Sequence, residues 1–309
     1  MTTLLISHPA GLNHLTPPGH PERPDRLRAV MQVLDEERFQ PLKRLEAPNA
    51  LLETIALCHP MDYVLALRDA VPKQGIVSID ADTSMSPGSF EAATRAVGGA
   101  TLAVDEVIGK RADNAFVAMR PPGHHTETAR AMGFCLFNSA AIAARYAQDR
   151  HGLERVAVID FDVHHGNGTQ DIFWDDKTAM YCSTHQMPLY PGTGAKSESG
   201  THNTIVNAPL SAGDGGDRFR EAFNSRILPR LRDFGPELVV ISAGFDAHKR
   251  DPLANLQLVE SDFAWATQQL MEIAEKSAQG RVVSVLEGGY DLEGLSQSTA
   301  AHVNALMRG

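Results

Sequence analysis

Cysteine is scarce in this 309-residue sequence, which has three: Cys58, Cys135 and Cys182. An odd number without paired spacing argues against a disulfide framework and favours a reducing compartment. The N-terminal stretch MTTLLISHP has an apolar run too short for a secretory signal and lacks a basic start. We therefore expect a cytoplasmic protein.

Long apolar runs and basic clusters are also missing. No stretch approaches the roughly 18 apolar residues of a membrane span, so we expect no membrane partner. The 38 acidic residues outnumber the 28 Lys and Arg residues and give a formal net charge of −10. Because phosphate binding needs clustered Lys and Arg, we expect no nucleic acid partner.

Internal repeats, low-complexity tracts and linkers are absent as well, which predicts a single domain over residues 1–309. Short, continuous apolar runs alternate with helix-like stretches, a pattern typical of parallel strands covered on both faces. We predict a three-layer α/β domain with a parallel sheet. The expected strands are Leu4–Ser7, Ala115–Met119, Arg155–Asp160, Ala179–Ser183, Leu238–Ser242 and Arg281–Leu286. The expected helices are Pro24–Glu37, Ser89–Gly109, Ser139–His151, Asp217–Leu231 and Ser261–Ala278, with Ser89 as a candidate cap.

Four of the expected strands lead directly into polar motifs. Ligands of open α/β sheets bind outside the carboxyl ends of the strands, so the four motifs should meet at one edge of the sheet. The motifs are RPPGHH with His124 and His125, DFDVHHGNG with Asp160, Asp162, His164, His165 and Asn167, SAGFDAH with Asp246, and EGGY with Tyr290.

The DFDVHHGNG motif has the composition of a metal site. Residues two apart in extended chain point to the same side, which places Asp160, Asp162 and His164 together. Two buried carboxylates beside an imidazole are costly unless a cation neutralises them. Asp and His ligands suit zinc or a similar divalent metal, and Asp246 is the natural ligand from another strand. The alternative is that the acids belong to a loop and pair with Arg155 or His165.

The other two motifs supply candidate catalytic groups. Two prolines and a glycine precede His124 and His125 and would hold both imidazoles steady beside a metal. Tyr290 would present a phenol that donates to a developing oxyanion. A plain polar loop and a packed surface tyrosine are the respective alternatives. His165 is interpreted as structural because it points opposite to His164.

The motifs together resemble the histone deacetylase family, and within it the class II type shared with bacterial histone-deacetylase-like amidohydrolases. The matching segments are HPERPDRL (20–27), DTSMSPGSFEAA (82–93), RPPGHH, GFCLFN (133–138), DFDVHHGNGTQ (160–170), YPGTG (190–194), SAGFDAHKRDPL (242–253) and LEGGY (286–290). The resemblance implies the arginase–deacetylase fold, with a central parallel eight-stranded sheet and zinc at its carboxyl edge. It also implies hydrolysis of an acyl amide on a lysine-like amine.

The resemblance further implies roles for individual residues. The implied zinc ligands are Asp162, His164 and Asp246. His125 becomes the general base and then acid, oriented by Asn167, and His124 becomes its electrostatic partner, backed by Asp160. Tyr290 becomes the oxyanion donor, which predicts real deacetylase activity. A potassium ion is implied near Asp160, Asp162, His164, Ser183 and Thr184.

The implied substrate tunnel is walled by Phe134, Tyr190 and Gly133, and Asp82 matches the rim acid that holds the substrate backbone. Tyr190 stands where the family usually has Phe, and residues 198–204 depart from a glycine-rich run common in the family. Leu253 stands where a polyamine-selective member type has glutamate. Since leucine offers an ammonium no charge partner, acyl-lysine in peptides or proteins is the expected substrate.

Three other interpretations remain. An acetylpolyamine amidohydrolase would use the same chemistry on small acylated amines. An arginase-type ureohydrolase needs two manganese ions and extra Asp ligands, and a catalytically dead binding module would lack part of the metal triad or Tyr290. The native metal, the acyl length and assembly into a homo-oligomer stay open.

Overall fold

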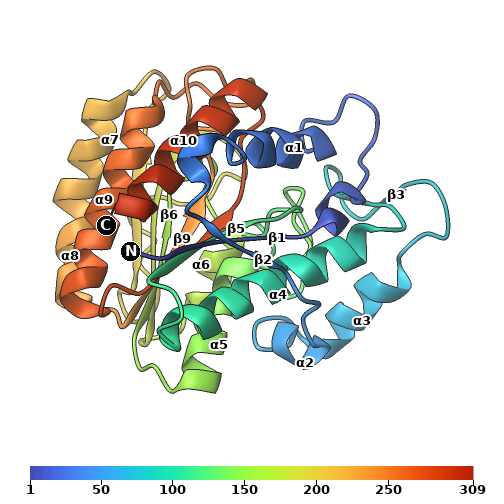
Figure 1. The fold of residues 1–309 in the computed structure, drawn as a ribbon, viewed down its shortest axis with the longest axis horizontal. Coiled ribbons are helices and arrows are strands. Elements are labelled where there is room, and N and C mark those ends of the chain that lie inside the picture. Colours follow the sequence, from blue (N-terminus) through green and yellow to red (C-terminus); the bar gives the residue numbers. More distant parts are fainter. Residues whose placement is uncertain (309) are drawn as a thin grey trace.

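The computed structural model describes residues 1–308, which are built around an eight-stranded parallel sheet with helices on both faces (Figure 1). The strand order is β2-β1-β5-β10-β9-β6-β7-β8, and every neighbouring pair is parallel. The strands are β1 (Thr3–Ser7), β2 (Lys43–Glu46), β5 (Asn114–Ala118), β6 (Val156–Asp160), β7 (Ala179–Gln186), β8 (Ile205–Leu210), β9 (Leu238–Ala243) and β10 (Val282–Leu286). A separate antiparallel pair joins β3 (Val77–Ser78) to β4 (Ser84–Met85).

The helices form two layers. One layer contains α1 (Pro24–Val33), α7 (Gly216–Ala222), α8 (Leu228–Phe234), α9 (Glu260–Ser277) and α10 (Leu292–Arg308), with a π-helical turn η3 (Phe223–Ile227) joining α7 to α8. The other contains α2 (Leu52–Ile55), α3 (Met61–Asp69), α4 (Ser89–Ile108), α5 (Ser139–His151) and α6 (Asn167–Phe173). Short 3-10 helices η1 (Pro9–Leu12) and η2 (Glu37–Phe39) flank α1. No helix within residues 1–308 is long and apolar enough to cross a bilayer.

Alternation along the strands divides the core between the two faces of the sheet. In β1, Leu5 packs with the layer of α1 and α10, whereas Leu4 and Ile6 pack with the layer of α4 and α5. Both faces are covered, so the strand residues are apolar on either side, as the continuous apolar runs predict.

The predicted fold class is confirmed, and all six expected strands are present. The prediction missed β2 and β8, which are the two edge strands of the sheet, and the helices α2, α3, α6 and α10. Ser89 does not cap α4: the cap position is Gly88, and Ser89 Oγ accepts from the Ser86 amide at 2.7 Å.

The four strands that end in polar motifs are neighbours. β5, β10, β9 and β6 occupy the four central positions in that spatial order, although they come fifth, tenth, ninth and sixth along the chain. Parallel strands bring their carboxyl ends to one edge, so the four motifs converge there.

Candidate active site

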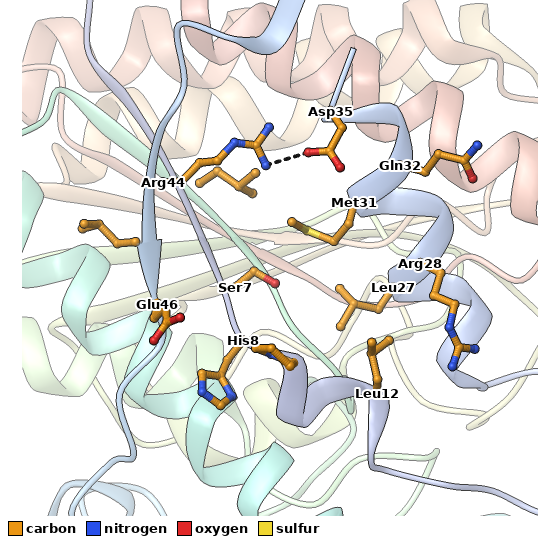
Figure 2. A pocket seen from close by; sticks show the side chains of 13 residues that line it. Ser7, His8, Leu12, Leu27, Arg28, Met31, Gln32, Asp35, Arg44 and Glu46 are labelled. Atoms are coloured by element: carbon orange, nitrogen blue, oxygen red, sulfur yellow. Dashed lines mark ion pairs between the residues drawn. The ribbon is translucent and has the colours of Figure 1, made fainter.

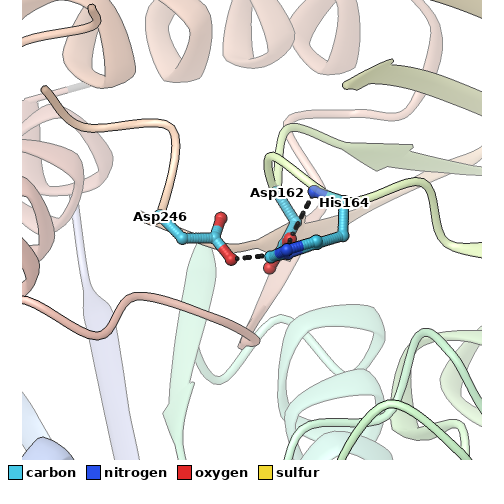
Figure 3. Close-up of side chains that lie close together, drawn as sticks. All are labelled: Asp162, His164 and Asp246. Carbon is cyan, nitrogen blue, oxygen red and sulfur yellow. Dashed lines mark hydrogen bonds and ion pairs between the residues drawn. The ribbon is translucent and has the colours of Figure 1, made fainter. Parts of the chain in front are cut away.

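Three buried side chains form a potential metal-binding triad at this edge. The ligand atoms of Asp162, His164 and Asp246 all lie within 4.8 Å of one another (Figure 3). His164 Nδ1 lies 3.2 Å from Asp162 Oδ1 and 3.0 Å from Asp246 Oδ2. One imidazole nitrogen and two carboxylates suit zinc, and three protein ligands leave a coordination position free for chemistry. The donor set therefore fits the implied metal.

The backbone fixes this triad through a series of short hydrogen bonds. Strand β6 ends at Asp160, and the chain then turns so that the Asp162 amide donates to Asp160 Oδ1 at 3.0 Å and the His164 amide donates to Asp162 Oδ1 at 2.9 Å. The Gly288 amide donates to Asp162 Oδ2 at 2.8 Å. A Cβ at Gly288 would collide with the carboxylates of both Asp162 and Asp246, so only glycine allows this approach.

The pKa values of Asp246 and His164 in the triad are strongly shifted. Burial, and then the Asp162 carboxylate, raise the pKa of Asp246 to about 7. Burial acts to lower the pKa of His164, but hydrogen bonds to Asp162 and Asp246 outweigh it and raise the pKa to about 10. Binding of a divalent cation would release the His164 proton and relieve the repulsion between the carboxylates.

His124 is hydrogen-bonded to Asp160, the last residue of β6. Its Nδ1 donates to Asp160 Oδ2 at 2.9 Å, and its Nε2 lies 3.8 Å from Asp162 Oδ2. Burial acts to lower the pKa of His124, but Asp162 and Asp160 raise it well above the usual value. The alternative pairing of these acids with Arg155 is wrong, because Arg155 pairs with Glu154 and Glu237.

His125 has the properties of a base. Its Nδ1 lies 2.8 Å from Asn167 Oδ1, and its ring lines the pocket described below. Burial, and then His124 and His164, hold the pKa of His125 well below the usual value. A neutral imidazole with Nδ1 engaged keeps the other nitrogen, Nε2, to accept a proton.

Tyr290 sits on a loop held by two buried charged residues. Arg26 donates to the carbonyls of Glu287 and Gly289, each at 2.5 Å, and its guanidinium lies 4.9 Å from the centre of the Tyr290 ring. The Glu287 carboxylate accepts from the Gly123 amide at 2.6 Å and the His124 amide at 3.2 Å. Burial raises the pKa of Tyr290 well above its usual value, so the phenol keeps its proton and can donate.

A cavity of about 240 Å³ leads to these groups. Its walls are Asp82, His125, Gly133, Phe134, His164, Leu189, Tyr190, Leu253 and Tyr290. The rings of Phe134 and Tyr290 pack edge to face with their centroids 5.8 Å apart. The rings of Tyr190 and His125 do the same at a centroid distance of 5.2 Å. Asp82 Oδ1 accepts from the Gly133 amide at 3.0 Å. The structure thus brings every predicted tunnel and rim residue into one cavity.

A larger cavity of about 580 Å³ lies elsewhere, between α1 and the edge strand β2 (Figure 2). Its floor is largely apolar, and its arginines are already paired: Arg44 with Asp35 at 3.0 Å and Arg28 with Asp25 at 2.7 Å. His8 is the one histidine among its lining residues, and neither the triad residues nor His124 and His125 line it. The candidate catalytic residues His125, His164 and Tyr290 line the smaller cavity.

The remaining predicted residues lie behind the triad. Asp160 and Ser183 are paired in register across β6 and β7. Ser183 Oγ is 2.8 Å from His185 Nδ1, and the buried Thr184 Oγ1 has no hydrogen-bond partner among the described residues. His165 Nδ1 contacts Thr193 Oγ1 at 2.8 Å, away from the triad.

Several residues at the site were missed from the sequence. Glu287 lies three residues before Tyr290 in the EGGY motif, and Arg26 lies in the HPERPDRL segment. Leu189 directly precedes Tyr190 and adds to the cavity wall. Glu127, two residues after His125, accepts from Asn167 Nδ2 at 2.8 Å. For Glu127, Glu287 and Arg26, the signal available in the sequence was a charged residue within or next to a motif.

Comparison with known proteins decides the family. The family model described as the histone deacetylase domain matches residues 20–306. The chain belongs to the histone deacetylase family. As a member of this family it is a hydrolytic enzyme of the deacetylase and amidohydrolase type, and its fold is the arginase–deacetylase fold.

Relatives of this deacetylase-family chain come from bacteria, archaea and plants. It is 39% identical to the "Histone deacetylase-like amidohydrolase" of Pseudomonas aeruginosa, over 93% of this chain and 80% of the relative. It is 40% identical to a "Probable deacetylase" of Archaeoglobus fulgidus, over 100% of this chain and 87% of the relative. A crystal structure titled as the HDA15 HD domain superposes with a TM-score of 0.94 at 35% identity, covering 99% of this chain and 88% of that one.

Proposed function

We propose that this chain is a zinc-dependent amidohydrolase that removes acetyl or other short acyl groups from lysine side chains of peptides or proteins. The observation that carries the proposal is the buried Asp162–His164–Asp246 triad, whose His164 lines a narrow cavity together with His125 and Tyr290. A zinc ion held by the triad would supply Lewis-acid polarisation of the amide carbonyl and of water.

Three side chains would carry out proton transfer and charge stabilisation. His125 is neutral and accepts the proton of the attacking water, then donates it to the leaving amine. His124, held in its charged form against Asp160, offsets the negative charge that develops beside it. Tyr290 donates its phenol proton as a hydrogen bond to the carbonyl oxygen as that oxygen becomes negative. The products are a free amine and a short carboxylate.

The cavity supports a slim substrate. Phe134 and Tyr190 flank it with aromatic rings, which would accept the methylene stem of lysine. Asp82, which lines the cavity, would accept hydrogen bonds from backbone amides of a bound peptide. Leu253 in the wall provides no charge for the second amine of an acetylated polyamine, which favours acyl-lysine over the polyamine alternative.

The metal assignment is tested by Asp246→Ala. We expect the purified variant to lose both zinc and deacetylase activity, because two ligands hold the ion far less tightly than three. Metal analysis and an acetyl-lysine peptide assay measure both. A variant with full zinc occupancy would contradict the role of Asp246.

The substrate class is tested by comparing kcat/KM on acetyl-lysine peptides, longer acyl-lysine peptides, N-acetylputrescine and acetylspermidine. We expect the acetyl-lysine peptide to be preferred, and Leu253→Glu to shift the ratio towards acetylated polyamines. A wild type that already prefers N-acetylputrescine would establish the alternative function, with the required acid at Asp82 or Glu198.

Potassium binding near Asp160, Asp162, His164, Ser183 and Thr184 forms part of this proposal. It is supported by the Thr184 hydroxyl, which has no hydrogen-bond partner within residues 1–308 and adjoins Ser183, the register partner of Asp160. The cytoplasmic location stays a prediction, since some relatives are named as chloroplastic. Homo-oligomer assembly also stays a prediction.

A further inference from the structure

Asn167 is an ambiguous partner for a catalytic imidazole. Its carboxamide has an acceptor at one end and a donor at the other, and rotation by half a turn exchanges them. Only the orientation with Oδ1 towards His125 makes Nδ1 the protonated nitrogen and leaves Nε2 as a base. The reversed amide would present N–H groups to Nδ1 and put the imidazole proton on the wrong nitrogen.

Glu127 removes this ambiguity. Its Oε1 lies 2.8 Å from Asn167 Nδ2, while Asn167 Oδ1 lies 2.8 Å from His125 Nδ1. A carboxylate accepts hydrogen bonds and donates none, so the amide must direct its NH₂ group to Glu127 and its oxygen to His125. The other neighbour of Nδ2, Met132 Sδ at 3.3 Å, is a weak acceptor and selects the orientation poorly.

The short segment around Glu127 is built to hold the carboxylate there. The Glu127 amide donates to the Arg130 carbonyl at 3.1 Å, which closes a tight turn. Thr128 donates to Asp171 of α6 through its amide at 2.9 Å and its hydroxyl at 2.7 Å. Asn167 begins the same helix, so Glu127 and the amide it contacts share one support.

We propose that Glu127 is a positioning residue that orients the Asn167 amide and thereby decides which nitrogen of His125 carries the proton. This inference rests on the proposed role of His125 as the proton carrier. It assigns Glu127 no contact with substrate: its effect passes entirely through Asn167.

That route through Asn167 gives a test by a double-mutant cycle in the zinc-loaded enzyme. Glu127→Ala should lower kcat roughly tenfold, within the range found for residues that orient catalytic groups, and leave KM and zinc content unchanged. Glu127→Gln should retain more activity, because its amide oxygen can still accept. In the Asn167→Asp background, residue 167 has no amide to orient, and its carboxylate would face the carboxylate of Glu127. Glu127→Ala removes that repulsion and should therefore raise kcat in this background.

Asp171→Ala is the companion variant. It loosens the Thr128 anchor that supports the Glu127 carboxylate, so in each background its effect on kcat should have the same sign as that of Glu127→Ala and be smaller. ¹⁵N spectra of the His125 imidazole provide a second measurement: we expect the Nδ1–H form in the wild type and a mixture of forms in Glu127→Ala.

The outcomes separate the two proposals. If Glu127→Ala lowers kcat by the same factor in both backgrounds, or leaves the wild-type kcat and imidazole spectrum unchanged, the inference is overturned. If His125→Ala itself retains the wild-type kcat, the proposed function fails. An inactive His125→Ala variant together with a fully active Glu127→Ala variant would overturn the role of Glu127 alone.

Discussion

At the scale of single residues, Tyr290 differs from the other groups in the cavity because its phenol acts only when the carbonyl oxygen becomes negative. We expect Tyr290→Phe to lower kcat by roughly 10²-fold or more with little change in KM, since an oxyanion donor stabilises the transition state above all. Steady-state kinetics on an acetyl-lysine peptide measure the split. An unchanged kcat would mean that the metal alone polarises the carbonyl.

His125 and His165 form a matched pair on the same scale. Both are buried imidazoles with a low pKa, but His125 lines the cavity and His165 contacts Thr193 outside it. His125→Ala should therefore abolish turnover, whereas His165→Ala should lower kcat far less. The comparison is made on folded variants with equal zinc content, and equal losses would refute the assigned geometry.

At the scale of elements, buried ion pairs tie α1 to the catalytic loops. Glu22, just before α1, accepts from Arg120 through both carboxylate oxygens at 2.5 Å and from Arg26 at 3.1 Å. Burial acts to raise the pKa of Glu22, but Arg120, His14 and Arg26 outweigh it and hold the pKa well below its usual value. The Glu22 carboxylate therefore stabilises the fold in its charged form.

We expect Glu22→Gln to lower the free energy of unfolding by about 3–5 kcal/mol, because it leaves buried arginines without a counter-charge. Urea denaturation measures the change. Asp25→Asn is the control: Asp25 pairs with Arg28 at the surface, where a pair contributes about 0–1 kcal/mol. The deficit of Glu22→Gln should be complete above the ordinary glutamate pKa and shrink as the pH falls towards the lower folded-state pKa. A deficit that stays constant down to pH 3 would contradict this origin.

The sequence predicted the six strands that read as continuous apolar runs and missed the two edge strands, β2 and β8, whose sequences lack such a run. β2 reads Lys43-Arg44-Leu45-Glu46 and shows no apolar run, and β8 contains Asn207 and Pro209, which an edge strand tolerates. The site followed from its motifs for a similar reason, because each motif directly follows a buried strand. The contacts of Glu287 with Gly123 and of Arg26 with Gly289 join residues more than 150 positions apart, so their partners depend on tertiary structure.

At the scale of the whole molecule, metal binding to the proposed triad would add to the stability of the fold. Asp162 and His164 follow β6 and Asp246 follows β9, so an ion bound to all three holds two strands of the sheet together. Zinc at 1,000 times its Kd should stabilise the folded protein by about 4 kcal/mol. Thermal melts with and without a chelator measure the shift. The melting temperature of Asp246→Ala should not respond to zinc, and an equal response would place the ion elsewhere.

The central position of β10 has a consequence for how the protein is made. β5 pairs with β1 and β10, and β9 pairs with β10 and β6, so before β10 arrives no strand ladder connects the block β2-β1-β5 with the block β9-β6-β7-β8. During synthesis the imidazoles after β5 and the proposed metal ligands after β6 and β9 thus belong to two halves of an unfinished sheet. The ribosome must add residues 282–286 before these halves can close, and Tyr290 follows within four residues. The nascent chain therefore gains its closed sheet and the full set of proposed catalytic residues only once β10 and Tyr290 have been translated.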